Sequence, residues 1–201
     1  MYGEKLSKDV LEIIELIEKG GQRLKHLVDN LIDISRIEYI KFKLQKESTD
    51  LSELIRDVSK ELMFLLRERK TNLNITLPES LFLKMDKVRI EQVIMNLLSN
   101  AIKNTPPKGD IKIVLKKKKH WAEFSISDTG IGLTQEEMDF LFTRFGKIER
   151  YGEGYEYINI QGTGLGLYIS KEIVDLHEGE IRGESEGRNK GSTFIVKLPI
   201  S

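Results

Sequence analysis

The chain has 201 residues, 39% of them hydrophobic, which is enough to bury a core of its own. Its 32 basic and 32 acidic side chains cancel, so no net charge attracts nucleic acid or an anionic membrane, and we expect no nucleic-acid partner. The absence of cysteine excludes disulfides, thiol nucleophiles and cysteine-ligated metals. No apolar run approaches the roughly 20 residues of a membrane span, so we expect a soluble, cytoplasmic segment.

The first predicted element is a long amphipathic helix at about residues 7–38. Apolar residues recur there at alternating spacings of four and three, which is typical of a helix that packs in a bundle. Such a helix cannot bury its apolar stripe alone, so we expect a partner helix, with a homodimer as the obvious candidate. A domain boundary is predicted near residue 40, which separates residues 1–40 from residues 41–201.

The rest of the chain alternates helical and strand-like segments. Helices are predicted at residues 51–69, 87–103, 135–141 and 165–177. Strands are predicted at residues 73–77, 81–85, 111–117, 121–127, 180–184 and 193–198. A Gly- and Tyr-rich loop at about residues 143–161 is long enough to act as a lid. Strands joined by hairpins and interspersed with helices predict an α/β fold, a two-layer sandwich with a mixed sheet and helices on one face.

The predicted helix at residues 87–103 carries a polar stripe. Asn96 and Asn100 lie one helical turn apart, and Lys103 projects from nearly the same side. Amide oxygens suit Mg²⁺ and an ammonium neutralises phosphate oxygens, so this stripe could hold a metal–nucleotide complex. A pair of buried asparagines bonded to backbone is the competing interpretation, and the stripe alone does not decide between the two.

A second polar feature, Ser127-Asp128-Thr129-Gly130-Ile131-Gly132-Leu133, directly follows a predicted strand. An Asp held there could accept a hydrogen bond from an adenine amino group, and the two glycines would let the base pack close to backbone. Asp-x-Gly is also ordinary turn chemistry, so a plain strand-ending turn is the simpler interpretation of this segment by itself.

The third feature, Gly162-Thr163-Gly164-Leu165-Gly166-Leu167, opens the predicted helix at residues 165–177. Its spacing matches neither the dinucleotide-binding fingerprint nor a phosphate loop that ends in Gly-Lys-Ser/Thr, and no strand immediately precedes it. Glycines at a helix N-terminus present N–H groups and the positive end of the helix dipole, which favour phosphate. A flexible hinge is the alternative.

The order of these features is more specific than any one of them. The asparagine helix, the Asp128 turn, the segment Phe142-Thr143-Arg144-Phe145 and the glycine box resemble the successive nucleotide-binding boxes of the sensor histidine kinase catalytic domain, which has a Bergerat-type ATP-binding fold. Upstream, residues 23–38 are similar to the end of that family's second dimerisation helix. Downstream, Gly191-Ser192-Thr193-Phe194 resembles its closing strand, so the resemblance covers essentially the whole chain.

The resemblance implies a role for each matching residue. Asn100 would ligate Mg²⁺, Asn96 would support the metal and the phosphates, and Lys103 would contact phosphate. Asp128 would recognise the adenine amino group. The residues that would line the pocket and its lid, or lie near the adenine, are Gly130, Gly132, Gly162, Thr163, Gly164, Leu165, Gly166 and Thr193. The chain departs from the family at Asn104, where an aromatic residue often lies near the adenine.

Two alternative functions remain beside the kinase. Gyrase-type and mismatch-repair ATPases share the fold and carry, at the position of Asn96, a Glu that polarises the attacking water. Asn cannot accept a proton at neutral pH, so the pocket resembles one that holds ATP for transfer to another acceptor. A non-catalytic nucleotide sensor would keep the pocket and transfer nothing, but intact Asn96, Asn100 and Asp128 argue against such decay.

None of the three histidines is expected to be a phosphoacceptor. The family phosphorylates a His within a Ser-His-Glu-Leu-Arg-Thr-Pro-like box, and no such box is present. His26 lies in the part that resembles the second dimerisation helix, and His177 ends the last helix, where the family has a similar structural His. His120 lies in a predicted hairpin. The lysine run at residues 116–119 is interpreted as the edge of that hairpin and not as a nucleic-acid patch.

The function that the resemblance implies is phosphoryl transfer in two-component signal transduction. With ATP and Mg²⁺ as cofactors, the domain would position the γ-phosphate for attack by a histidine on the dimerisation helix of the same full-length protein. A response regulator receiver domain would be the next partner, and the full-length protein would form a homodimer, with its membrane anchoring left open. This fragment alone is not expected to autophosphorylate.

Overall fold

The computed structural model describes residues 43–144, 146 and 164–200, together with isolated residues between 10 and 32. The chain divides into two compact units, Met1–Phe42 and Lys43–Ser201. In the first unit, the described residues from Val10 to Ile32 are helical, and their large apolar side chains are exposed. No helix among the described residues is long and apolar enough to cross a membrane.

The second unit is built on a five-stranded mixed sheet with the strand order β2-β4-β5-β7-β6. Its strands are β2 (Asn72–Thr76), β4 (Asp110–Lys117), β5 (Trp121–Asp128), β6 (Glu180–Glu184) and β7 (Ser192–Pro199). Strands β2 and β4 run parallel, and the other neighbours are antiparallel. A separate two-stranded antiparallel sheet pairs β1 (Glu47–Asp50) with β3 (Phe82–Met85).

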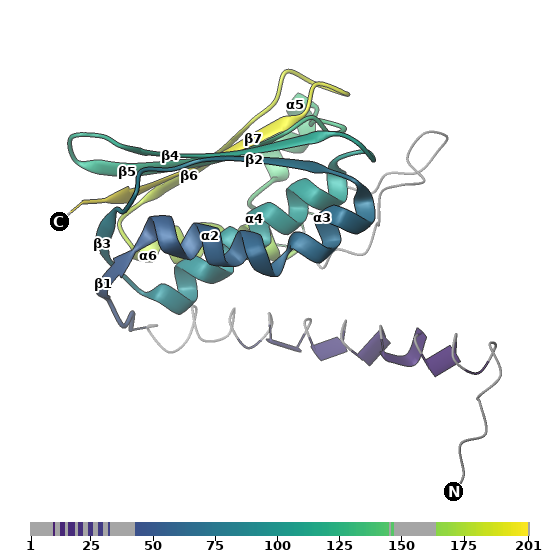
Figure 1. Cartoon of the computed structure of the whole chain (residues 1–201), viewed down its shortest axis with the longest axis horizontal. Helices are drawn as coiled ribbons and strands as arrows, with labels where there is room; N and C mark the ends of the chain where they lie inside the picture. Colours follow the sequence, from purple (N-terminus) through teal and green to yellow (C-terminus); the bar gives the residue numbers. More distant parts are fainter. Residues whose placement is uncertain are drawn as a thin grey trace, which may run out of the picture. The chain divides into compact units, whose positions relative to one another are not determined.

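Helices cover one face of the five-stranded sheet, as Figure 1 shows. They are α2 (Leu51–Glu61), α3 (Met63–Arg69), α4 (Lys87–Asn104) and α6 (Gly166–Leu176), and a short helix α5 (Gln135–Phe140) follows β5. Apolar residues of α2, α4 and α6 recur at helical spacing and are buried, which gives the helices their inner faces. The predicted two-layer α/β architecture with a mixed sheet is confirmed.

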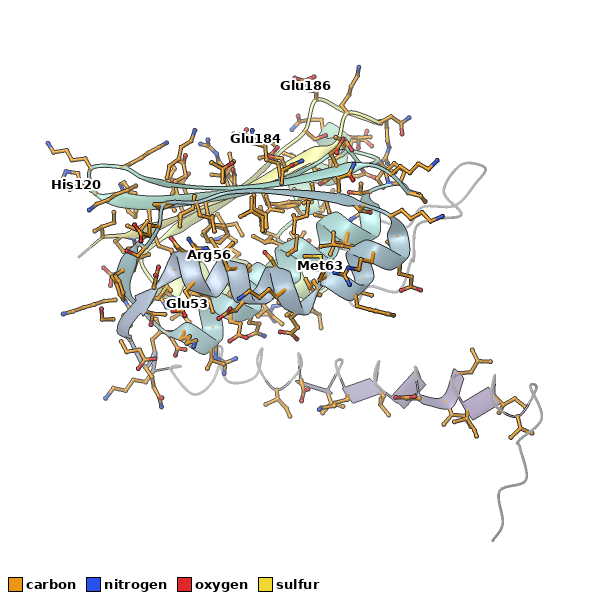
Figure 2. All side chains as sticks on the ribbon, viewed as in Figure 1. Glu53, Arg56, Met63, His120, Glu184 and Glu186 are labelled. Carbon is orange, nitrogen blue, oxygen red and sulfur yellow. The ribbon has the colours of Figure 1, made fainter. Side chains whose placement is uncertain are left out.

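Alternating burial along the strands separates an inner from an outer face of the sheet. Asp128 ends an alternating series of buried β5 residues and therefore faces the helices, as do Ala122, Phe124 and Ile126. Glu184 extends from β6 on the side away from the helices (Figure 2). Thr193 lies directly opposite Glu184 in the β6–β7 register, so its side chain belongs to the outer face.

Two local features differ from the prediction. The helix expected at residues 51–69 is divided at Leu62, where the backbone leaves helical geometry, into α2 and α3. Strand β1 was not predicted, because its sequence Glu-Ser-Thr-Asp has no apolar alternation; it is a strand because β3 supplies its hydrogen-bond partners. Asp50 reinforces this corner, since its carboxylate accepts from the N–H groups of Ser52 and Leu81, both at 2.9 Å.

Candidate functional site

Helix α4 carries the predicted polar stripe. Its buried apolar face consists of Ile90, Val93, Ile94, Leu97, Leu98, Ala101 and Ile102. Asn96, Asn100 and Lys103 lie beside this face and are half-buried. The structure therefore brings the three predicted side chains to one side of one helix, partly shielded from water, where hydrogen bonds and charge interactions are stronger than in bulk solvent.

The side-chain amide of Asn96 joins α4 to α6. Its Nδ2 donates to the carbonyl oxygen of Gly166 at 3.2 Å and to Ser170 Oγ at 3.3 Å. A carbonyl oxygen only accepts, so the amide nitrogen must face α6. No described residue donates to Asn96 Oδ1, so this oxygen remains able to accept a hydrogen bond or to ligate a cation. Asn96 is thus partly structural, as the competing interpretation supposed, and its side-chain oxygen has no described donor.

Asn100 and Lys103 have fewer protein partners. Within the residues that the structure describes, none forms a hydrogen bond with the Asn100 side chain and no carboxylate pairs with the Lys103 ammonium. Burial lowers the pKa of Lys103, and the nearby charge of Arg69 lowers it further. A half-buried ammonium beside a guanidinium favours the approach of an anion, because an anion would relieve both effects.

The C-terminal end of α4 is fixed in place. Arg69 Nη1 donates to the carbonyl oxygens of Ile102 and Lys103 at 3.0 and 2.9 Å, which satisfies two of the carbonyls that a helix end leaves unpaired. Asn104 folds back on the helix, with its Nδ2 donating to the carbonyl oxygen of Asn100 at 2.8 Å. The carbonyl oxygen of Asn104 accepts from Ile131 N at 3.3 Å, which ties α4 to the turn after β5.

The carboxylate of Asp128 is held rigidly at the end of β5. It is 7% exposed; its Oδ1 accepts from Gly130 N at 2.8 Å, and its Oδ2 accepts from Ser192 Oγ at 2.6 Å. Gly130 is required because a Cβ there would lie 2.3 Å from the carbonyl oxygen of Asn104. Gly132 has φ +63°, which favours glycine. The turn is therefore more than a strand ending, since it fixes a buried carboxylate against α4.

Ser192, and not Thr193, lies beside Asp128. Ser192 is directly opposite Asp128 in the β5–β7 register and faces the helices with it. Thr193 Oγ1 donates to Ser127 Oγ at 3.0 Å on the outer face of the sheet. The structure does not bring Thr193 to the predicted adenine position, because neighbouring residues of a strand point to opposite faces. The strand register identifies Ser192 as the residue that faces Asp128. The sequence alone places two hydroxyl side chains next to each other and does not say which of them faces the helices.

The glycine box leads into α6. Gly164 has φ +70°, and α6 begins at Gly166 after an N-cap, Leu165, that makes no side-chain capping hydrogen bond. The first N–H groups of α6 have no acceptor within the helix, which suits them to bind an anion. Gly162 and Thr163 lie outside the described residues, as do most of the predicted lid and its tyrosines.

Arg144 lies beside the first turn of α6, a position that the sequence motif did not indicate. Its Nη2 donates to the hydroxyl of Tyr168 at 3.1 Å, and its guanidinium carbon is 5.0 Å from the centroid of the Tyr168 ring. A cation is thereby held near the helix N-terminus. Only the topology, which brings the end of α5 close to α6, could have shown this contact.

A metal ion at this site would depend on amide and nucleotide oxygens. In the described ranges, no group of three or more His, Cys, Asp or Glu side chains could hold a metal ion. The side-chain amide of Asn100 has no hydrogen-bond partner among the described residues, and Asn96 directs its nitrogen to α6, which leaves its oxygen. Mg²⁺ binds hard oxygen ligands and commonly shares them between the protein and nucleotide phosphates, so these residues fit Mg²⁺.

Comparisons with known proteins agree with this geometry. The family described as histidine kinase-, DNA gyrase B-, and HSP90-like ATPase matches residues 85–201, which include α4, the Asp128 turn, the glycine box and β7. Sensor histidine kinase TmoS of Ectopseudomonas mendocina is 34% identical over 189 residues, which cover 93% of this chain and 19% of TmoS. The chain thus spans about a fifth of the length of that relative.

Solved structures give the same assignment. Histidine kinase AdeS of Acinetobacter baumannii aligns with a TM-score of 0.73 and 27% identity over 100% of this chain and 87% of that chain. Histidine kinase ThkA, solved in complex with response regulator protein TrrA, aligns with a TM-score of 0.75 and 26% identity over 98% of this chain and 53% of that chain. The fold, the order of the boxes and these matches agree: the chain belongs to the family of histidine kinase-, DNA gyrase B-, and HSP90-like ATPases and carries an ATP-binding catalytic domain of the sensor histidine kinase type.

Proposed function

We propose that this domain binds Mg²⁺-ATP and presents its γ-phosphate to a histidine on a dimerisation helix of the full-length protein. One observation carries the proposal: a buried, rigidly held carboxylate at Asp128 lies in a turn that packs against the C-terminal end of α4, and the same helix carries Asn100 and Lys103 without described partners. This arrangement matches a ligand with a hydrogen-bonding base at one end and a charged, metal-bound group at the other.

Asp128 would select adenine. Each of its oxygens accepts a protein hydrogen bond, and a carboxylate oxygen can accept more than one, which allows a further bond from an exocyclic amino group. Guanine presents a carbonyl oxygen at the corresponding position, and two acceptors facing each other in a buried site repel. Discrimination against GTP would therefore come from an unpaired buried acceptor, which is more costly than a missing contact in an apolar pocket.

The phosphates would lie between α4 and the N-terminus of α6. The oxygens of Asn96 and Asn100 would hold Mg²⁺, and Lys103 with the first N–H groups of α6 would bind phosphate oxygens. Bound Mg²⁺ would supply charge neutralisation during phosphoryl transfer. The chain's own residues would orient the triphosphate. The hydrogen bonds from Asn96 to α6 would hold α4 and α6 in fixed positions on the two sides of the phosphates.

Transfer to another molecule is favoured over hydrolysis because of Asn96. An amide cannot act as a general base at neutral pH, so the residue cannot activate water as a Glu would. The exposed apolar residues of the first unit, which include Ile13, Leu16, Ile17 and Leu24, support a helical partner in a dimer. The complex of ThkA with a response regulator supports a receiver domain as the next partner. We also propose that this segment lies in the cytoplasm.

The test supplies the missing acceptor. This chain is mixed with γ-labelled ATP, Mg²⁺ and a high concentration of the helix hairpin that carries the phosphoacceptor histidine of the cognate full-length protein. We expect the hairpin to gain label that is lost in acid and survives base, as a phosphoramidate does. Changing the acceptor histidine of the hairpin is the control and should abolish the label.

Three results would contradict the proposal. Rapid multiple-turnover phosphate release without the hairpin would indicate an ATPase. Absence of label despite saturating ATP and a demonstrated complex with the hairpin would indicate a nucleotide sensor without catalysis. Label on this chain that disappears with His26→Ala would show that the acceptor lies within the sequence itself.

A further inference from the structure

Helices α4 and α6 are joined by polar contacts at two places. One is the bond between Asn96 and the first turn of α6. The other lies at the opposite end of α6, where His177 is 2% exposed and its Nε2 accepts from Asp86 N at 3.0 Å. The two helices pack against each other, and both bury apolar side chains, among them Val93 of α4 and Ile173 of α6.

The bonds of His177 define its protonation. Its Nδ1 lies 2.7 Å from the carbonyl oxygen of Ile173, which only accepts, so Nδ1 carries the proton. Its Nε2 faces the N–H of Asp86, so that nitrogen must be unprotonated. The ring is therefore neutral, and a second proton would place an N–H against an N–H. With both nitrogens engaged in a buried site, the ring has no free atom for a phosphoryl group.

Asp86 extends this arrangement to a third segment. Its Oδ1 accepts from Arg89 N at 3.2 Å and caps α4, while its Oδ2 accepts from Gln45 N at 2.9 Å. We call the set of Gln45, Asp86, Ile173 and His177 the His177 junction. It joins the segment at residues 43–46, the start of α4 and the end of α6, which are remote from one another in sequence.

The surroundings of the ring favour its neutral form overall, mainly because the ring is buried. Burial lowers the pKa of His177 most, and the charge of Lys46 lowers it further. The hydrogen bond to Ile173 and the charge of Asp86 act in the opposite direction. Lys46 is itself paired at 3.5 Å with the exposed carboxylate of Glu178, the residue after His177.

We propose that His177 is a positioning residue for nucleotide binding, which acts by holding the start of α4 and the segment at residues 43–46 against the end of α6. The inference rests on the proposed nucleotide site. Apolar packing is not directional and permits two helices to slide, whereas hydrogen bonds at their ends fix the register. Helix α4 has no Gly or Pro in its 18 residues, so a displacement at Asp86 would be transmitted along the helix towards Asn96 and Asn100.

The experiment compares His177→Gln with His177→Leu. A Gln oxygen can still accept from Asp86 N but does not titrate, and Leu provides volume without an acceptor. Asp86→Asn is the second test: one amide oxygen keeps the cap on Arg89, while the amide nitrogen cannot accept from Gln45 N. His120→Gln and His120→Leu are matched controls, because His120 is exposed at the end of the β4–β5 hairpin (Figure 2).

Mg²⁺-ATP affinity is measured by calorimetry at pH 7.5, at a temperature where every variant is folded. We expect His177→Leu to weaken binding on the order of five- to tenfold and His177→Gln to stay within about twofold of the unchanged chain. The Mg²⁺-ATP affinity of Asp86→Asn should lie between those of the two His177 variants, and the affinities of the His120 variants should match that of the unchanged chain. A residue that only stabilises the fold would lower Tm and leave these dissociation constants unchanged.

A pH profile of unfolding without nucleotide gives the second readout. The folded pKa of His177 is below its ordinary value, so the unfolded chain takes up the proton first as the pH falls. Stability from this group is therefore full above about pH 6.5 and is lost towards lower pH. The free energy of unfolding of His177→Gln and of His177→Leu should lack this part of the pH dependence, and that of His120→Gln should retain it.

The outcomes separate the two proposals. If the unchanged chain binds no ATP, the proposed function fails and the positioning role fails with it. If the chain binds ATP but His177→Leu binds equally well, only the positioning role is overturned. A pH slope that persists in His177→Gln would also overturn it, because the neutral ring would then have no part in the junction.

Discussion

In the Asp128 turn, both carboxylate oxygens of Asp128 accept hydrogen bonds from the protein, and glycines let the turn pack against α4. In the polar stripe of α4, no described residue forms a hydrogen bond with the side chain of Asn100, and Lys103 is a half-buried ammonium without a described carboxylate partner. The Asp128 turn is complete before any ligand arrives. The stripe has the donors and acceptors of a site whose remaining partners come from the ligand.

This difference has an energetic consequence. Side chains that are bonded to the protein contribute to folding as well as to binding, so removing them costs both. Side chains whose hydrogen-bond partners come only from a ligand contribute little to the stability of the folded chain, and a buried charge among them can lower that stability. Substitutions in the Asp128 turn and in the polar stripe of α4 should therefore be distinguishable by measuring stability and nucleotide affinity together.

Asn100→Ala should have the largest effect on activity. Because Asn100 would ligate Mg²⁺, we expect phosphoryl transfer to the hairpin to fall by more than about 100-fold and Mg²⁺-dependent ATP binding to disappear. Stability should be equal or slightly higher, since Ala has the better helix propensity and no hydrogen bond with a described residue is lost. Transfer assays and thermal unfolding provide the measurement, and a marked fall in Tm would show that the residue is structural.

Asp128→Ala should affect both properties. Loss of a hydrogen bond to a charged group corresponds to about 1.5–3 kcal/mol, so ATP affinity should fall by one to two orders of magnitude and approach that for GTP. Gly130 N and Ser192 Oγ would lose their acceptor, so the free energy of unfolding should also decrease, by about 1–3 kcal/mol. Calorimetry with both nucleotides and denaturant titration test this. Equal ATP and GTP affinity in the unchanged chain would refute the assignment.

Lys103→Met should separate binding from stability. We expect ATP affinity to fall by about tenfold, as a charge-assisted contact with phosphate is lost. Without nucleotide the variant should be at least as stable, because the low pKa of Lys103 shows that burial and Arg69 disfavour its charge in the folded chain. In the unchanged chain, the pKa of Lys103 is lower in the folded than in the unfolded state, so the free energy of unfolding should rise as the pH increases towards the unfolded pKa. Thermal unfolding between neutral and alkaline pH tests whether Tm rises in this way in the unchanged chain and not in Lys103→Met.

Ser192→Ala should have the smallest effect, and Thr193→Ala is its neighbour control. Ser192 orients Asp128 through one hydrogen bond, worth about 1 kcal/mol, so ATP affinity should fall about fivefold. Thr193 lies on the outer face of the sheet, so its variant should bind ATP within about twofold of the unchanged chain. A larger loss for Thr193→Ala than for Ser192→Ala would contradict the assigned faces.

Much of the fold followed from local patterns. The helical repeat of α4 and the alternation along β5 are properties of neighbouring residues, and both elements lie within one residue of their predicted bounds. The strand β1 did not follow, because its pairing with β3 is a contact with a distant segment, and the division at Leu62 did not follow because the helical repeat continues through it. The polar stripe of Asn96, Asn100 and Lys103 could be predicted, since helical geometry alone places residues three or four apart on one face.

Other parts of the site depended on contacts across the chain. The bond that orients Asp128 comes from Ser192, 64 residues away, and the carbonyl oxygen of Asn104 accepts from Ile131 N in the turn after β5. The partner of His177, Asp86, is 91 residues away. Short-range periodicity determines which residues form an element and which face they share. The choice between Ser192 and Thr193, and the joining of Gln45, Asp86 and His177, required the strand register and the helix packing, because these contacts form only when distant segments come together.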